Sequence, residues 1–392
     1  MRPIPATALA PIASLTPPER GELTEPTRRR CRRLPHVLGT TVFAAVLALA
    51  APNAPCAEVT ASEEITYRVR QTVTVGPFDA AAKRVACWVS IPDDDPNQVV
   101  LDLAVASAPG EWAIVKEPRD GNRFLYVQAV APKATSLDVV VDFVLRRRSV
   151  SVRLANGQAG ALDPAQRTLF AEELREDSPH MEVTREIRQL AAEVCGSETN
   201  STRRAQLLLA KVAEIADHYS KDKTKPQCGI GDAEDCLTNG GGCCTDLHSL
   251  FIALARSAGV PARLQMGYRL LPKNDGKLVD PGYRCWVEYF APGNGWTPAD
   301  IVEADAPEGL GPTVWFSGLT AHRLWLNQGR EFRLPHAANP QPVNHMSIGY
   351  AEVDDRPIRL LPEGDLPAQI SRKIQFDILG KDAPSHLPKV AR

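Results

Sequence analysis

Two adjacent thiols, Cys243 and Cys244, follow a run of three glycines at positions 240–242. Apolar residues then recur at helical spacing from Leu247 to Ala258, so Cys244 is expected in the first turn of a helix. A cysteine there feels the positive end of the helix dipole and nearby backbone N–H groups, which favour the thiolate. The same N–H groups can stabilise the oxyanion formed when a thiolate attacks a carbonyl carbon. Cys244 is therefore the candidate nucleophile of an acyl-transfer reaction.

A thiol nucleophile of this kind works with a base and with a group that orients the base. Two expected strands follow the helix, at 283–290 and from 296 toward 300. The first carries Arg284 near its start, and the second ends at Asp300. His248 lies four residues after Cys244, on the same face of the expected helix. The side chains that would serve Cys244 are therefore expected at these three positions.

Four segments in order resemble the transglutaminase-like superfamily, a group with a papain-like core. Its pattern is Cys-x-Asp, Gly-Ile-Pro-Ala-Arg, His-x-Trp-x-Glu, and Gly-Trp followed by Asp. Here the segments read Cys244-Thr245-Asp246, Gly259-Val260-Pro261-Ala262-Arg263, Arg284-Cys285-Trp286-Val287-Glu288, and Gly295-Trp296 with Asp300. The match covers roughly residues 165–305 and is closest to bacterial exported members of the superfamily.

The resemblance implies a thiol mechanism that needs no cofactor and no metal ion. By position, Cys244 is the nucleophile and Asp300 the orienting acid, with Asp246, Trp286 and Arg263 as supporting residues. The family chemistry is attack on an amide or peptide carbonyl. Hydrolysis then makes a member a peptidase or an amidase, and transfer to an amine makes it a cross-linker. For a member of the bacterial exported kind, the resemblance favours hydrolysis.

The main departure from the family is Arg284, which occupies the position of the catalytic histidine. An arginine stays protonated, so it can hold a thiolate by charge but cannot exchange a proton with the reacting groups. General acid–base catalysis is typically worth about 10²–10⁴-fold in rate. The sequence therefore predicts impaired amide chemistry, with His248 as the candidate substitute base.

Several alternatives stay open. The chain is either an impaired thiol enzyme or a non-catalytic pseudoenzyme that binds a peptide, a protein or cell-envelope material in the old cleft. A third hypothesis is a zinc module, although its spacing is irregular and it lacks a Cys-x-x-Cys pair. Taken singly, Asp300 could end a strand, Arg284 could pair with Glu288, and His248 could be structural. The residues of the zinc hypothesis are Cys228, Cys236, Cys243, Cys244 and His248.

The elements around the site predict an α+β protein. Residues 58–150 contain several short runs of alternating apolar and polar residues, which are typical of a β-sandwich-like domain. Residues 164–305 contain helical periodicities followed by strands, as expected for a papain-like core of helices on an antiparallel sheet. Residues 306–392 form a Pro-rich C-terminal extension with few evident elements.

The N-terminal 57 residues are expected to be a leader and signal peptide. Five arginines between positions 28 and 33 precede a short apolar run, and small residues follow it. The protein is therefore expected to be exported, to the periplasm or beyond the cell, and to meet a membrane only through an uncleaved signal. The formal net charge of −2 excludes the basic stripe of a nucleic-acid-binding protein. In an oxidising compartment Cys243 is a candidate for a disulfide with Cys236 or Cys228.

Overall fold

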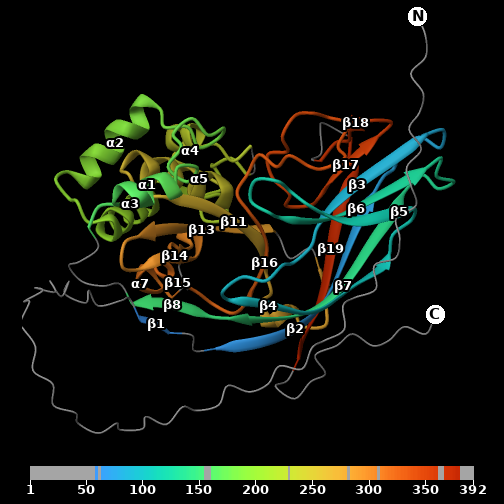
Figure 1. Ribbon diagram of the computed structural model, residues 1–392, viewed down its shortest axis with the longest axis horizontal. Helices are drawn as coiled ribbons and strands as arrows, with labels where there is room; N and C mark the ends of the chain where they lie inside the picture. Colours follow the sequence, from blue (N-terminus) through green and yellow to red (C-terminus); the bar gives the residue numbers. More distant parts are fainter. Residues whose placement is uncertain are drawn as a thin grey trace, which may run out of the picture. The chain divides into compact units, whose positions relative to one another are not determined.

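The computed structural model describes residues 58–60, 63–153, 160–227, 230–279, 283–306, 310–360 and 366–379. The predicted leader at 1–57 lies outside the described residues. Among the helices of the described part, none is long and apolar enough to cross a membrane. Figure 1 shows helices gathered on one side of the described chain and long strands on the other.

Two five-stranded antiparallel sheets form the β domain. They pack face to face because their alternate residues are apolar, as in β2, where Tyr67, Val69, Val73 and Val75 are buried. The first sheet has the order β12 (Leu278–Val279), β19 (Ile370–Leu379), β2 (Glu64–Val75), β7 (Leu137–Arg148) and β4 (Gln98–Ser107). The second has the order β18 (Arg356–Pro357), β17 (Tyr350–Val353), β3 (Arg84–Ser90), β6 (Arg123–Val130) and β5 (Glu111–Lys116).

The chain after residue 306 returns to this sandwich. Few elements were expected in this Pro-rich part, yet β19 pairs with β2 over ten residues and β17 pairs with β3. The segments that complete the two sheets are thus more than 250 residues from their partners in the chain, so the first and last parts form one body.

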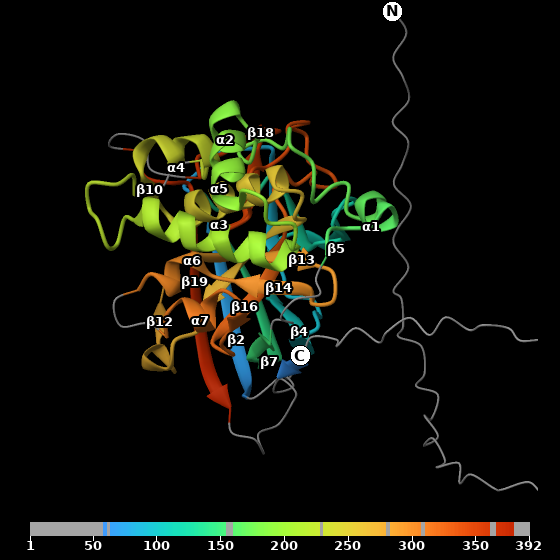
Figure 2. The ribbon, with the colours of Figure 1, turned by 90° about the vertical axis from the view of Figure 1, so that its left-hand side faces the viewer.

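The helical part is built around α5 (Cys244–Ser257), which is buried along almost its whole length. Figure 2 looks onto this side, where other helices cover α5. A helix that is apolar on all sides must be covered on all sides, which explains this central position. The surrounding helices are α1 (Pro164–Leu169), α2 (Arg185–Cys195), α3 (Ser201–Ile215) and α4 (Ala233–Asn239).

A four-stranded antiparallel sheet packs beneath α5. Its order is β14 (Gly295–Ala299), β13 (Tyr283–Ala291), β11 (Ala262–Arg269) and β16 (Arg323–Gln328). One face of this sheet contacts α5, and the sheet lies between the helices and the β domain in Figure 1. The α+β architecture predicted from the sequence, with antiparallel sheets before a core of helices on a sheet, is confirmed.

Short elements complete the core. A two-stranded parallel ladder joins β9 (Asp217–His218) to β10 (Gly241–Gly242), immediately before α5. The remaining elements are β1 (Glu58–Thr60), β8 (Val150–Arg153), η1 (Pro272–Asn274), α6 (Ile301–Ala304), α7 (Pro312–Trp315) and β15 (Gly318–Leu319).

Candidate functional site

Cys244 is the first residue of α5, as the sequence predicts, and its side chain is almost fully buried. Hydrogen bonds from Cys243 and Cys285 hold the pKa of the Cys244 thiol well below its ordinary value. Burial opposes this shift, and the charge of Arg284 adds to it. This environment therefore favours the thiolate of Cys244, which is the reactive form of a cysteine.

The thiol of Cys285 lies on the face of β13 that contacts α5. Its Sγ is 3.2 Å from Nδ1 of His248 and 3.7 Å from Oγ1 of Thr245. Burial and the neighbouring Cys244 raise the Cys285 pKa well above its ordinary value, so this residue stays a thiol. Cys285 thus lies between His248 and the nucleophile, a role that the sequence did not suggest.

His248, the predicted substitute base, has both ring nitrogens in use. Nε2 lies 3.2 Å from the backbone N of Ile301, and because that amide can only donate, the ring proton is on Nδ1 and points to Cys285. Burial lowers the His248 pKa, partly offset by Asp300 and Cys244, and the ring is neutral. The imidazole therefore acts on Cys244 through Cys285 rather than by direct contact.

Asp300, the predicted orienting acid, is fully buried at the N-cap of α6. Its Oδ1 accepts a hydrogen bond from the backbone N of Glu303 and lies 3.7 Å from Nε2 of His248. Its Oδ2 is 2.5 Å from the guanidinium of Arg323. Burial works to raise the Asp300 pKa, but Arg323 and His248 hold it below its ordinary value. Asp300 is thus an ionised carboxylate beside His248, held by an arginine that sequence reasoning missed.

Arg284 has a half-buried guanidinium at the edge of this cluster. Its Nε is 3.7 Å from Oε1 of Glu303, while Glu288, its partner in the salt-bridge alternative, pairs with Arg263 at 2.8 Å. Burial opposes its charge, but Cys244 and Asp300 raise the Arg284 pKa above its ordinary value. Arg284 therefore supplies a fixed positive charge near the thiolate and no titrating proton.

Asp246 serves the first turn of α5. Its Oδ2 accepts a hydrogen bond of 2.8 Å from the backbone N of Cys243. A Cβ placed on Gly242 would lie only 2.7 Å from the same oxygen, so the glycine before the two cysteines makes room for this carboxylate. Asp246 therefore caps the nucleophile's helix rather than contacting a reacting group.

His218 is a further site residue that sequence reasoning missed. It lies in β9, paired with Gly242 of β10, and so sits beside the strand that leads into Cys244. Burial lowers the His218 pKa to about 4. Among the neighbouring charges, that of Cys244 has the largest effect and works in the opposite direction. Its Nδ1 accepts a hydrogen bond from the backbone N–H of Ser220, so the proton of the neutral ring is on Nε2. A two-residue strand has no periodicity from which this position could be inferred.

The predicted disulfide of Cys243 and the zinc hypothesis both include Cys228, which lies outside the described residues. Cys236 is a free thiol, so the disulfide between Cys236 and Cys243 is not formed. Within the described ranges, no group of three or more His, Cys, Asp or Glu side chains is arranged to hold a metal ion.

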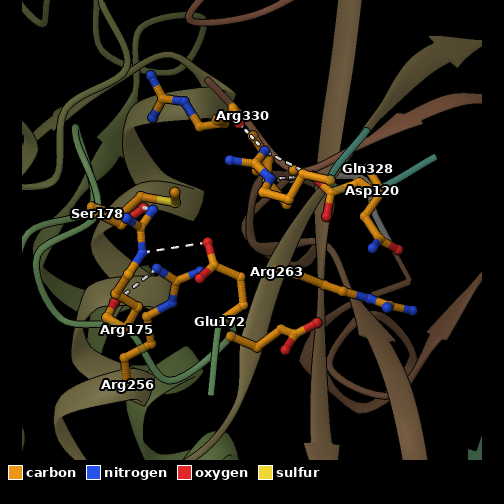
Figure 3. A pocket seen from close by; sticks show the side chains of 13 residues that line it. Asp120, Glu172, Arg175, Ser178, Arg256, Arg263, Gln328 and Arg330 are labelled. Carbon is orange, nitrogen blue, oxygen red and sulfur yellow. Dashed lines mark hydrogen bonds and ion pairs between the residues drawn. The ribbon is translucent and has the colours of Figure 1, made fainter. Parts of the chain in front are cut away.

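The two remaining supporting residues, Trp286 and Arg263, lie on the face of the sheet opposite to Cys285. Arg263 also borders a small hollow that Figure 3 shows from close by, together with Arg175, Arg256 and Arg330. This hollow has a volume of about 40 Å³, which is room for a few water molecules at most. The guanidinium groups of Arg256 and Arg330 donate hydrogen bonds to backbone carbonyls. The hollow is thus a structural arginine cluster rather than a substrate pocket.

Comparisons with known proteins bear on the superfamily and the fold of the part of the chain that contains this site. Residues 188–301 match the model of the Transglutaminase-like superfamily. The chain is 28% identical over 324 residues to an uncharacterised protein of Haemophilus influenzae, covering 74% of this chain and 87% of that protein. It is similar to the crystal structure of a putative cysteine protease from Cytophaga hutchinsonii, with a TM-score of 0.55 and 15% identity over 85% of this chain and 96% of that one. Red sea bream transglutaminase is a more distant match, with a TM-score of 0.28 and 12% identity over 64% of this chain and 50% of that one.

The chain therefore contains a transglutaminase-like domain, and it shares its fold with the protein from Cytophaga hutchinsonii. This confirms the resemblance seen in the sequence at the level of the superfamily domain.

Proposed function

We propose that this protein is a cysteine-thiol acyl-transfer protein in which Cys244 attacks amide or peptide carbonyls and water releases the product. Cross-linking is the less favoured outcome, because the relative from Cytophaga hutchinsonii is described as a putative cysteine protease. The observation that carries the proposal is the position of the buried Cys244 at the start of α5, where hydrogen bonds from two thiols and the charge of Arg284 lower its pKa.

The same geometry limits the reaction. Attack by Sγ of Cys244 forms a C–S bond and an oxyanion, which the N–H groups of the first turn of α5 can stabilise. Breaking the C–N bond of an amide then requires a proton on the leaving nitrogen. Arg284 does not release one, and the only ring proton of His248 points to Cys285. We therefore expect slow amide cleavage and faster reaction with thioesters or activated esters, whose leaving groups need no proton.

The test is acylation of Cys244 by a peptide thioester, followed by intact-protein and peptide mass spectrometry. The wild-type protein should gain one acyl group on Cys244, and Cys244→Ser should gain none. Arg284→His restores the family's histidine position and should raise amide hydrolysis by about 10²–10⁴-fold. Absence of acylation in a folded wild-type protein would exclude the enzymatic proposal.

The alternative is a pseudoenzyme that binds a peptide, a protein or cell-envelope material without turning it over. The position of Arg284 favours it, because this guanidinium lies near Glu303 and replaces a titrating imidazole with a fixed charge. Failure of both acylation and rescue by Arg284→His would support this alternative.

The exported location also stays a proposal. It is supported by the basic and apolar pattern of the first 57 residues. N-terminal sequencing of the protein from a cell-envelope or medium fraction would test it, and an uncleaved N-terminus in the cytoplasmic fraction would contradict it.

A further inference from the structure

The four-stranded sheet beneath α5 has a second face, pointing away from the helix, that plays no part in the proposed acyl transfer. Side chains at alternate positions of β14, β13, β11 and β16 point away from α5 and line a cavity of about 340 Å³. Other lining residues come from the β domain and from β8, including Asp95, Arg147 and Val152. We call it the tryptophan cavity, because Trp286, Trp296 and Trp325 line it.

Polar groups cross the floor of the tryptophan cavity in a continuous network. One oxygen of Glu288 accepts hydrogen bonds from Arg263, at 2.8 and 3.0 Å, and from Gln265, at 2.9 Å. The amide oxygen of Gln265 in turn accepts a hydrogen bond of 2.6 Å from the indole of Trp325. The network fixes the orientation of planar polar groups beside aromatic rings, as expected of a preformed ligand site.

The charges that line the cavity are paired within the protein. Glu288 is 2.8 Å from Arg263, and Asp95 is 2.7 Å from Arg147. The third carboxylate of the lining, Asp94, accepts a hydrogen bond of 2.7 Å from the backbone N of Val100, so each of the three carboxylates has a partner within the protein. A ligand that fits this lining is uncharged, with polar groups at its edges and an apolar face.

One buried donor in the wall is unpartnered. Arg147 has only 2% of its side chain exposed, and its Nε has no hydrogen-bond partner among the described residues. A buried N–H without an acceptor is costly, and a ligand oxygen can satisfy it. Arg147 lines the cavity together with the three tryptophans, so a ligand oxygen bound there can supply the missing acceptor.

We propose that the tryptophan cavity binds a neutral saccharide. The C–H face of a pyranose ring would pack on the indole of Trp325, because Arg263 covers the ring of Trp296 and Trp286 is only 1% exposed. The neighbouring hydroxyls of the sugar would pair with planar amide, carboxylate and guanidinium groups. The volume of the cavity is within the range of small-molecule sites, which begins at about 300 Å³. The proposal is independent of catalysis, because none of Cys244, His248 and Cys285 lines the cavity.

The test is titration of the purified protein with N-acetylchitotriose, cellotriose and maltotriose, followed by calorimetry and by tryptophan fluorescence. We expect saturable binding of at least one of them. Trp325→Leu should weaken that binding by about tenfold or more, because it removes an aromatic face. Arg147→Met gives a second variant in the lining and should also weaken binding.

The matched control is Trp112→Leu, which removes a half-exposed indole of β5 that does not line the cavity. It should leave binding unchanged, and so should Cys244→Ser, which separates this proposal from the acyl-transfer proposal. Circular dichroism and thermal unfolding establish that each variant is folded. The proposal is overturned if the folded wild-type protein binds none of the three sugars at millimolar concentration. The proposal is also overturned if Trp325→Leu and Arg147→Met both bind the sugar as tightly as the wild-type protein does.

Discussion

The buried pair of Arg323 and Asp300 leads to a prediction about stability. The guanidinium is 1% exposed and the carboxylate 0%, and they are 2.5 Å apart. Arg323→Met keeps an extended apolar side chain but leaves the carboxylate of Asp300 without its closest cation. Removing one partner of a buried ion pair typically costs about 3–5 kcal/mol. We expect the lower end, about 3 kcal/mol, because the charge of Arg284 still favours the ionised Asp300.

The dependence of this loss on pH distinguishes an electrostatic cause from lost packing. The folded-state pKa of Asp300 lies below its ordinary value, so the pair contributes stability above the unfolded pKa of about 3.9. That contribution disappears as the pH falls through the folded pKa. The free-energy difference between wild type and Arg323→Met should therefore be full at pH 7 and should shrink in acid.

The assay is urea unfolding at several pH values, with Asp300→Asn/Arg323→Met as the matched double variant. Because the double variant has no unpaired buried charge, it should recover a large part of the loss, so the two sites should be strongly coupled. A loss below about 1 kcal/mol at pH 7, or a loss equally large in acid, would refute the reasoning.

Three further predictions concern the nucleophile's surroundings. Cys285→Ala removes a hydrogen bond to the thiolate, which is worth about 1.5–3 kcal/mol. The Cys244 pKa should therefore rise by about 1–2 units, as measured by the pH profile of iodoacetamide alkylation. An unchanged profile would contradict this role of Cys285. Gly242→Ala places a Cβ against Asp246 and should destabilise the protein by about 1–3 kcal/mol in urea unfolding, whereas a neutral effect would contradict the close contact. His218 has a folded pKa of about 4, below its unfolded value, so its neutral ring contributes stability above pH 6.5 that is lost as the pH falls toward 4. His218→Gln should reduce this loss in acid unfolding, and equal acid sensitivity would contradict it.

The sequence predicted the parts of the site that local patterns determine. A glycine run before an apolar helix indicated where α5 begins, and the structure starts that helix at Cys244. The alternation in β13 also predicted that Arg284 and Cys285 lie on opposite faces. Alternation does not tell which face meets a helix, and packing places Cys285 against His248.

Other parts depend on contacts between distant segments. Arg323 is 23 residues from Asp300, and no local pattern marks one arginine among many as its partner. The strand β19 did carry a signal, since Ile370, Ile374 and Phe376 fall on one face, but it lies in a Pro-rich region that resembled an extension. Local alternation identifies a strand, but it does not tell which distant strand is the partner, here β2.

Arg284 has different consequences for the nucleophile and for the tryptophan cavity. Near Cys244 it supplies a fixed positive charge where the family pattern has a titrating imidazole. By strand alternation Arg284 lies on the same face of β13 as Trp286 and Glu288. Those two side chains are nevertheless positioned by β11 and β14, and neither is hydrogen-bonded or ion-paired to Arg284 in the described structure. Arg284→His should therefore change the reactivity of Cys244 while leaving saccharide affinity within about twofold, and a parallel change in both would show that the two sites are coupled.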